Sequence, residues 1–203
     1  MKSYDQIFLA NRAWVQTIKN VDEDYFKNLS LGQSPKYFWI GCADSRMSPT
    51  MITRSKLGEL FVHRNVANLV KEDDENFMAS LRYAVDYLKV KHIVVAGHYS
   101  CGGVKAAFDG LQDPYLTKWI DDIKQTLDAN EAEIANIGDE TQKLNRLTEL
   151  SIIKQVDKLA SMDIIKDAWA KGQRLFVHGW IFNISTGELN SLKEIHPDDM
   201  NTK

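Results

Sequence analysis

The 203-residue sequence has only two cysteines and four prolines, and no apolar run approaches the roughly 20 residues of a membrane-spanning helix. Its N-terminus lacks a basic segment followed by an apolar stretch, so we predict no secretory signal peptide. With 25 basic and 28 acidic residues, the chain offers no excess of positive charge for nucleic acid. Two cysteines without an export signal fit a reducing compartment, where thiols bind metals or catalyse more often than they cross-link. We therefore expect a cytoplasmic protein with neither a nucleic-acid nor a membrane partner.

The chain also lacks repeats, low-complexity tracts and a Pro/Gly-rich linker, which favours one domain over residues 1–203. Within it, residues 1–30 form a helical arm and residues 194–203 a polar tail. The arm is predicted because its apolar residues recur near one helical face. These residues are Ile7, Phe8, Trp14, Val15 and Ile18. Asp22 is expected to cap a second short helix that ends at Leu29.

Apolar runs alternate with amphipathic segments along the rest of the chain. Strands are predicted at 36–42, 59–63, 91–97 and 174–182. Helices are predicted near 48–56, at 75–89, from Gly102 onward, and at 114–129, 140–160 and 162–171. This alternation is typical of an α/β fold with a mostly parallel central sheet flanked by helices.

Both cysteines lie in polar clusters that follow predicted strands. The first cluster is Cys42-Ala-Asp44-Ser-Arg46, and the second contains His98-Tyr-Ser-Cys101. A lone cysteine is usually a small buried hydrophobe. Two thiolates and one imidazole, however, are a common ligand set for a catalytic zinc with one open position. The clusters would meet at the carboxyl edge of the sheet if their strands are neighbours, which the spacing alone does not establish.

Other cysteine chemistries fail on spacing. No Cys-x-x-Cys redox pair is present, and a Cys-x5-Arg phosphatase loop would need arginine where Ser48 and Ala107 stand. The zinc-deaminase pattern and the Walker A phosphate loop are absent as well. With zinc retained, Asp44 has two possible roles. Paired with Arg46 it would accept a hydrogen bond at the metal, and released from Arg46 it could become the fourth ligand.

Several stretches resemble the β-class carbonic anhydrases. Cys42-Ala-Asp44-Ser-Arg46 resembles their Cys-x-Asp-x-Arg motif, and Gly97-His98-Tyr-Ser-Cys101-Gly-Gly103 resembles their Gly-His-x-x-Cys-Gly-Gly motif. Gly58-Glu-Leu-Phe-Val-His-Arg64-Asn-Val-Ala-Asn68 resembles a third block, and Val177-His-Gly-Trp180 resembles the last strand. The similarity runs from about residue 32 to about residue 190.

The resemblance implies a function and a set of roles. Members hydrate CO2 reversibly to bicarbonate and a proton through zinc-bound hydroxide, with one Zn²⁺ per subunit. The implied ligands are Cys42, His98 and Cys101; Asp44 is the implied catalytic residue, and Arg46 orients it. Gln33 and Gly102 match substrate-binding positions. Members assemble as homodimers or homotetramers, with an N-terminal helical arm laid over the partner.

One subgroup of the family is inhibited by bicarbonate at a second site, which favours a closed state with the aspartate on zinc. Trp39 and Arg64 match two residues of that site. The third is a tyrosine, and its match here is Phe182, which lacks the hydroxyl donor. Met47 replaces a small residue after the arginine. Ordinary structural roles are the competing interpretation, in which Trp39 is a core residue and Arg64 pairs with a carboxylate.

The CO2 pocket should be small and apolar, and Phe61, Val66 and Tyr83 are its candidate walls. Two other functions stay open. A hydrolase of the same fold, acting on carbonyl sulfide or carbon disulfide, would use the same ligands. A non-catalytic zinc-binding regulatory module would not depend on Asp44.

Overall fold

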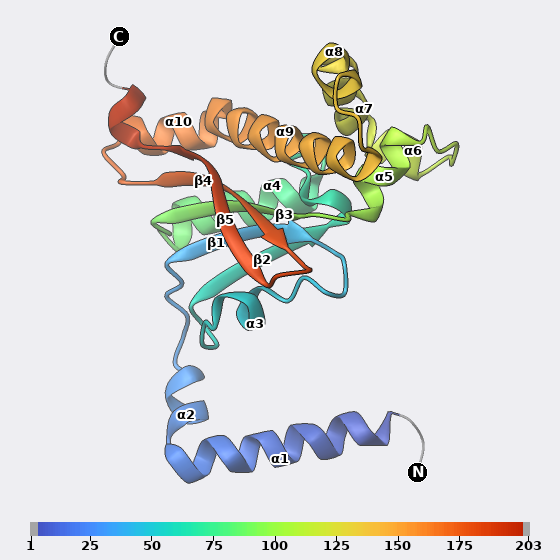
Figure 1. The fold of residues 1–203 in the computed structure, drawn as a ribbon. Helices are drawn as coiled ribbons and strands as arrows, with labels where there is room; N and C mark the ends of the chain where they lie inside the picture. Colours follow the sequence, from blue (N-terminus) through green and yellow to red (C-terminus); the bar gives the residue numbers. More distant parts are fainter. Residues whose placement is uncertain (1–3, 201–203) are drawn as a thin grey trace. The chain divides into compact units, whose positions relative to one another are not determined.

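The computed structural model describes residues 4–200, which divide into two compact units (Figure 1). The first unit ends at Ser34 and contains α1 (Asp5–Val21) and α2 (Tyr25–Leu29). The helical character of the arm is therefore as predicted, and α1 buries none of its residues. Asp22 does not cap α2. Its carboxylate accepts the backbone N–H of Asp24 at 3.1 Å, and Asp24 is the residue that precedes the helix.

The second unit, which begins at Pro35, contains a five-stranded sheet in the order β2-β1-β3-β4-β5. Its strands are β1 (Tyr37–Cys42), β2 (Leu60–Asn65), β3 (His92–His98), β4 (Phe176–Asn183) and β5 (Glu188–Ile195). The first four pair in parallel and β5 is antiparallel to β4, which confirms the α/β class and the mostly parallel sheet. Within the described part of the expected polar tail, β5 extends through Ile195 and a 3₁₀ helix follows at Pro197–Met200; the remaining tail residues, 201–203, lie outside the described residues.

The helices of this unit are α3 (Pro49–Thr53), α4 (Glu75–Arg82), α5 (Gly102–Phe108), α6 (Leu116–Trp119), α7 (Asp121–Ala129), α8 (Glu131–Ala135), α9 (Glu140–Ser161) and α10 (Asp163–Ala170). Short helical turns lie at Val66–Asn68 and Tyr83–Tyr87. The helix predicted at 75–89 is therefore α4 followed by a π-turn, and the one predicted at 114–129 divides at Ile120. None of the helices within residues 4–200 is long and apolar enough to cross a membrane.

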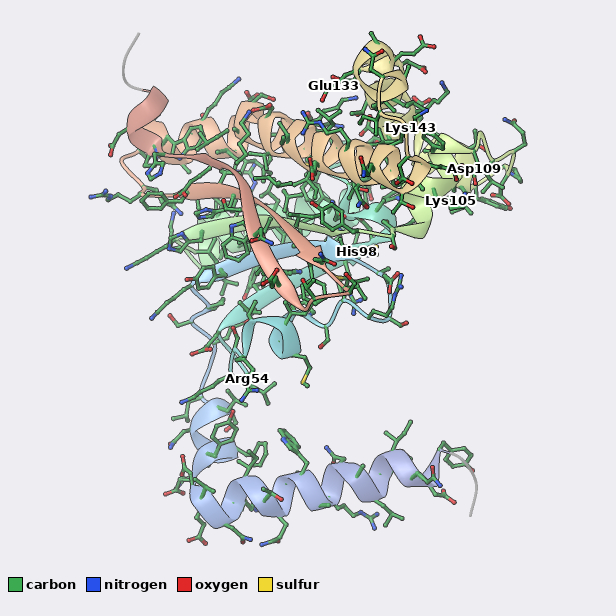
Figure 2. The ribbon with its side chains drawn as sticks, viewed as in Figure 1. Arg54, His98, Lys105, Asp109, Glu133 and Lys143 are labelled. Carbon is green, nitrogen blue, oxygen red and sulfur yellow. The ribbon has the colours of Figure 1, made fainter. Side chains whose placement is uncertain are left out.

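Both faces of the central strands β1 and β3 are covered, so these two strands read as continuous apolar runs. Phe38 and Ile40 on β1 pack into one buried cluster, whereas Trp39 packs into a second cluster on the other face. Charged side chains such as Lys105 and Glu133 stay exposed on the helices, while His98 lies inside the unit (Figure 2). The sheet is therefore a rigid platform whose strand ends can position functional groups.

Register brings the predicted ligands to one edge of that platform. β1 and β3 are parallel neighbours, with Gly41 opposite Ala96. Cys42 is the last residue of β1 and His98 is the last residue of β3. Both side chains therefore emerge at the carboxyl edge, as the placement of the clusters after strands predicts.

Candidate metal centre and active site

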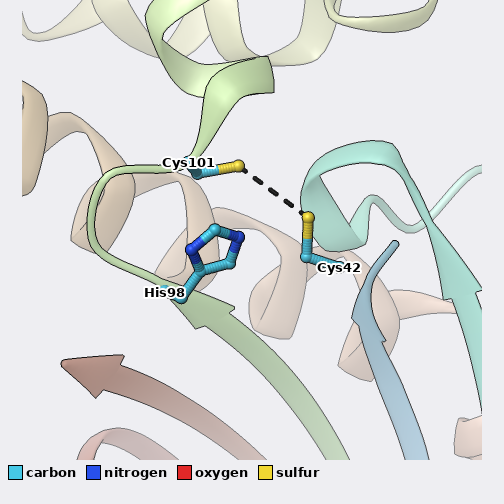
Figure 3. A group of neighbouring side chains, drawn as sticks. All are labelled: Cys42, His98 and Cys101. Atoms are coloured by element: carbon cyan, nitrogen blue, oxygen red, sulfur yellow. Dashed lines mark hydrogen bonds between the residues drawn. The ribbon is translucent and has the colours of Figure 1, made fainter. Parts of the chain in front are cut away.

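The side chains of Cys42, His98 and Cys101 converge, with one potential ligand atom from each lying within 4.8 Å of the others (Figure 3). The two Sγ atoms are 3.9 Å apart. His98 is fully buried, and each cysteine is 4% exposed. Three soft donors enclosed in this way form a pocket for a small cation that prefers sulfur and nitrogen ligands.

The turn after β3 positions the third potential donor, Cys101. Ser100 has a positive φ of 58°, which reverses the chain so that Cys101 comes back over His98. α5 then begins at Gly102. At Gly103 a Cβ atom would lie 3.0 Å from the Cβ of Ala67, a tighter contact than nearly all Cβ atoms make, so glycine favours the close approach there. No atom lies within 4 Å of the Cβ position of Gly102, so close packing does not explain that glycine.

His98 has a fixed tautomer. Its Nδ1 is 2.9 Å from the carbonyl oxygen of Tyr99, which can only accept, so Nδ1 carries the proton. Nε2 is then a lone-pair donor, and it is buried without a hydrogen-bond partner. A buried polar atom without a partner is costly, whereas a metal ion would satisfy it. This orphaned nitrogen beside two sulfurs shows that the residues fit a metal.

Each of the two thiols shifts the pKa of the other. The pKa of Cys42 is lowered to about 4, chiefly because the Cys101 side chain hydrogen-bonds its sulfur, with further contributions from backbone N–H groups such as that of Asp44. The pKa of Cys101 is raised, first by its hydrogen bond with Cys42 and then by burial. Two buried thiolates this close repel each other, so deprotonating both requires a neighbouring positive charge. Zn²⁺ with two thiolates and a neutral imidazole sums to zero charge, which suits this enclosure.

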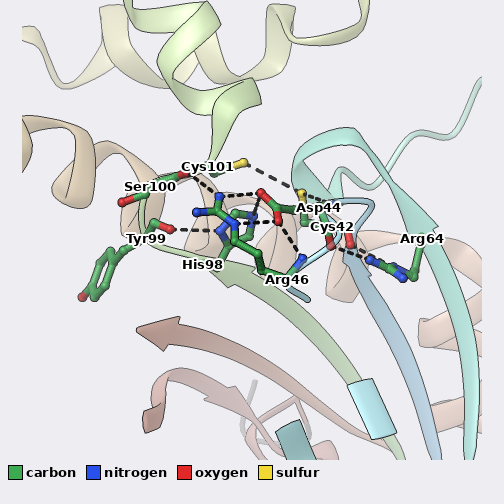
Figure 4. Close-up of polar contacts among 8 residues, drawn as sticks. All are labelled: Cys42, Asp44, Arg46, Arg64, His98, Tyr99, Ser100 and Cys101. Carbon is green, nitrogen blue, oxygen red and sulfur yellow. Dashed lines mark hydrogen bonds and ion pairs between the residues drawn. The ribbon is translucent and has the colours of Figure 1, made fainter. Parts of the chain in front are cut away.

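Asp44 is held by Arg46 beside the three donors (Figure 4). The backbone N–H and Nε of Arg46 each donate to Oδ1 at 2.9 Å, and Nη2 donates to Oδ2 at 2.7 Å. These bonds lower the pKa of Asp44 well below its usual range. Its Oδ2 lies 3.8 Å from Nε2 of His98. An ionised carboxylate with fixed lone pairs therefore faces the space that the donors enclose.

Arg64 does not pair with a carboxylate in the described structure. Its Nε donates to the carbonyl oxygen of Cys42 at 2.9 Å, and its Nη2 donates to that of Asp44 at 2.7 Å. Arg64 thus holds the backbone of the segment that carries the Cys42 thiol and the Asp44 carboxylate. Nothing in the sequence pattern signalled this contact, because it depends on Arg64 lying opposite Gly41 in the neighbouring strand.

Of the other residues expected at the site, some are buried in the core of the second unit and one belongs to the first unit. Trp39 is 1% exposed and contacts Trp180 edge-on at 6.0 Å, so it is a core residue in this structure. Phe182 and Met47 are buried in the same cluster as Cys42. Gln33 belongs to the first unit, so its role in substrate binding stays a prediction.

Among the candidate walls of a CO2 pocket, Val66 lies beside the site, because its Cγ1 is 3.1 Å from the Cβ position of Gly103. Phe61 packs instead against the opposite buried cluster and contacts Tyr83 at 5.7 Å between ring centroids. Phe61 and Tyr83 therefore belong to the other face of the sheet from the cysteines.

Comparison with known proteins gives a consistent result. A family described as carbonic anhydrase matches residues 37–189. A carbonic anhydrase of Emericella nidulans is 41% identical over 191 residues, covering 94% of this chain and 84% of that protein. The structure of a Coccomyxa β-carbonic anhydrase in complex with acetazolamide superposes with a TM-score of 0.91 at 37% identity, covering 96% of this chain and 89% of that one. One of two tetrameric β-carbonic anhydrases from Sordaria macrospora gives a TM-score of 0.90 at 34% identity, covering 96% and 100%.

Proposed function

We propose, from the premise that this chain belongs to the β-carbonic anhydrase family, that Cys42, His98 and Cys101 hold one zinc ion per subunit for the reversible hydration of CO2. The observation that carries the proposal is the buried Nε2 of His98, which has no partner and faces two sulfurs. The β-carbonic anhydrase neighbours and the donor chemistry support zinc over other metals.

Zinc bound there would supply a Lewis acid that lowers the pKa of water toward about 7. The protein's residues do the rest. Asp44 stays ionised because Arg46 donates to both of its oxygens, so it accepts a hydrogen bond and orients the attacking water. The carbonyl of Tyr99 holds the His98 proton on Nδ1, and Arg64 fixes the backbone at Cys42 and Asp44.

The proposal extends to assembly, location and substrate contacts. The Sordaria neighbours are described as tetrameric, which supports a homodimer or homotetramer here. The chemistry of two free thiols supports the cytoplasm. Gln33 and Gly102 are proposed to contact the substrate by their match to the family motif.

We also propose that bicarbonate regulates the site through Asp44. In the described structure Asp44 is paired with Arg46, which is the arrangement expected of an active centre. Its Oδ2 is already 3.8 Å from Nε2 of His98, so a short movement would make it a fourth ligand and close the site. Structures at low and high pH with bicarbonate decide this: a water retained on zinc at low pH would contradict the switch.

The central test is stopped-flow CO2 hydration at alkaline pH, before and after zinc chelation and after zinc is restored. Asp44→Asn should lower kcat/KM by about 10²- to 10⁴-fold, since it removes a charged acceptor at the reacting water, while the bound zinc content stays unchanged. Asp86→Asn is the matched control, because Asp86 also pairs with an arginine, Arg82, at 2.8 Å. Absence of chelator-sensitive activity would refute the proposal.

Two alternatives predict different outcomes in the same experiments. A carbonyl sulfide or carbon disulfide hydrolase would turn over the sulfur substrate faster than CO2 under steady-state conditions. A non-catalytic zinc module would bind zinc but show no hydration, and Asp44→Asn would leave its function intact.

A further inference from the structure

We propose that Tyr99 and Glu149 are positioning residues for the metal, and that through them α9 sets the geometry of the turn between His98 and Cys101. The inference rests on the proposed zinc site, and it adds a connection from the ligands to a helix far along the chain. Neither residue touches the three donors through its own side chain, so both would act through the turn.

The backbone of Tyr99 is fixed from two directions. Its carbonyl oxygen accepts the Nδ1 proton of His98 at 2.9 Å, and its N–H donates to the carbonyl oxygen of Phe182 on β4 at 3.1 Å. The first bond sets the ring orientation of a ligand. Any displacement of Tyr99 therefore moves the acceptor that holds the His98 imidazole.

The side chain of Tyr99 supplies a third anchor. Its hydroxyl donates to Oε1 of Glu149 at 2.7 Å, a charge-assisted hydrogen bond between residues 50 positions apart. Oε2 of the same carboxylate accepts from Nη1 of Arg146 at 3.0 Å, and Nε of Arg146 donates to Glu133 at 2.6 Å. Both oxygens of Glu149 are thus engaged, which holds the acceptor in one orientation.

These hydrogen bonds matter because the residue that follows Tyr99, Ser100, has a strained backbone conformation. Ser100 has a φ of 58°, in the left-handed region that residues with a Cβ rarely adopt. Its carbonyl oxygen accepts from Nη2 of Arg46 at 3.3 Å, and this arginine also holds Asp44. A change in the turn would therefore displace both His98, a proposed metal ligand, and Arg46, which orients the Asp44 carboxylate.

The anchor can be removed without disturbing the core. Tyr99, Ser100, Arg146 and Glu149 line a surface pocket of about 600 Å³. Glu149 has 23% of its side chain exposed, so water can replace a lost hydrogen bond there. We therefore expect Tyr99→Phe, which deletes a single oxygen, to fold normally.

The experiment measures zinc affinity of the metal-depleted protein by competition with a chromogenic chelator, together with the visible spectrum of the Co²⁺-loaded protein. Tyr99→Phe should weaken zinc binding by about tenfold, the lower end of the range for residues that support metal ligands, and should shift the Co²⁺ bands. Glu149→Gln keeps an oxygen acceptor and should weaken it less than Glu149→Ala. Adding Tyr99→Phe to Glu149→Ala should produce little further loss, because both remove the same bond.

Two control variants separate positioning from general destabilisation. Tyr115→Phe removes a hydroxyl from a side chain that is 85% exposed, and Lys158→Gln breaks the 3.2 Å ion pair between α9 and Asp122. Both should bind zinc as the wild type does. Zinc affinity of Tyr99→Phe within twofold of wild type, or an equal loss in Lys158→Gln, would overturn the inference. Failure of the wild type itself to bind zinc would instead refute the proposed function along with it.

Discussion

Replacing Gly97 with alanine tests how tightly α9 is seated on β3 beside His98. A Cβ atom at this position would lie 2.6 Å from Cδ1 and 2.9 Å from Cγ1 of Ile152, and 3.2 Å from Oδ1 of Asn68. The first two distances are shorter than any ordinary carbon–carbon contact, so Ile152 must move. Overpacking of this kind in a well-packed core costs about 1–3 kcal/mol. We expect Gly97→Ala to lower the free energy of unfolding by that amount.

A second substitution shows whether Ile152 is the cause. Ile152→Val removes Cδ1, the atom nearest the new methyl group, and alone should cost about 0.5–1.5 kcal/mol. Independent effects would sum to about 1.5–4.5 kcal/mol in the double variant. Because the valine gives the new methyl group room, the double variant should lose at least about 0.5 kcal/mol less than that sum. The relief is partial, since valine keeps both γ-carbons.

The assay is urea unfolding of the metal-depleted protein followed by circular dichroism, so that zinc binding makes no contribution. Gly138→Ala is the matched control: no atom lies within 4 Å of its Cβ position, and its effect should be neutral or slightly stabilising. Additivity of Gly97→Ala and Ile152→Val within about 0.3–0.5 kcal/mol would refute the reasoning. Such additivity would mean that α9 moves away from the sheet to admit the new methyl group, so that its contact with Ile152 has no energetic effect.

Zinc removal should lower the midpoint of thermal unfolding, because a ligand at 1,000 times its dissociation constant stabilises the folded state by about 4 kcal/mol. In Cys101→Ser the chelated and the zinc-loaded protein should unfold at the same temperature. An unfolding midpoint of the wild type that does not change on chelation would contradict the proposed zinc site. Stability should also fall as the pH drops below about 6.5, the pKa of an exposed histidine. Burial lowers the pKa of His92 and His178 in the folded protein. As the pH falls, these histidines are therefore protonated in the unfolded chain before they are in the folded one, which favours unfolding. His178→Gln should flatten the slope of unfolding free energy against pH in urea titrations, and an unchanged slope would exclude this source. Finally, Phe182→Tyr should strengthen inhibition of CO2 hydration by bicarbonate; equal inhibition of both proteins would show that the missing hydroxyl is irrelevant.

The four parallel strands could be predicted from sequence, whereas the antiparallel edge strand β5 could not. β1 and β3 are covered on both faces, so they appear as apolar runs. β5 carries its apolar residues at Leu189, Leu192 and Ile195, a spacing of three that does not suggest a strand. Side chains alternate between the two faces of a regular strand, so residues three apart should point to opposite faces. Leu192 and Ile195 nevertheless pack against the same buried cluster, because a register shift opposite Gly179 and Trp180 inserts an extra residue into β5 at this point. Such a bulge leaves no reliable mark in a sequence.

The candidate ligands Cys42, His98 and Cys101 could be identified from sequence because each lies in a short polar motif. That their side chains converge could not be identified in this way. Cys42 and His98 meet only since β1 pairs with β3, a long-range choice that spacing cannot fix. The same limit applies to Arg64. Its bonds to two backbone carbonyls depend on β2 lying along β1, and a sequence pattern gives only its charge.

Backbone strain at the site is the feature that was hardest to predict from the sequence. Ala67, Asn68 and Ser100 have positive φ values without being glycine, and each such residue costs about 1–3 kcal/mol. An alanine or a serine gives no warning of this. The turn that holds Ala67 is clamped by Asn65, whose side chain exchanges two hydrogen bonds of 2.8 Å with the backbone of Leu69. The result is useful at the site, because the N–H of Ala67 is directed at the Cys42 sulfur and helps to lower its pKa. Strain on both sides of the three donors is therefore offset by fixed side-chain anchors, and the chain's own contacts bring these donors together.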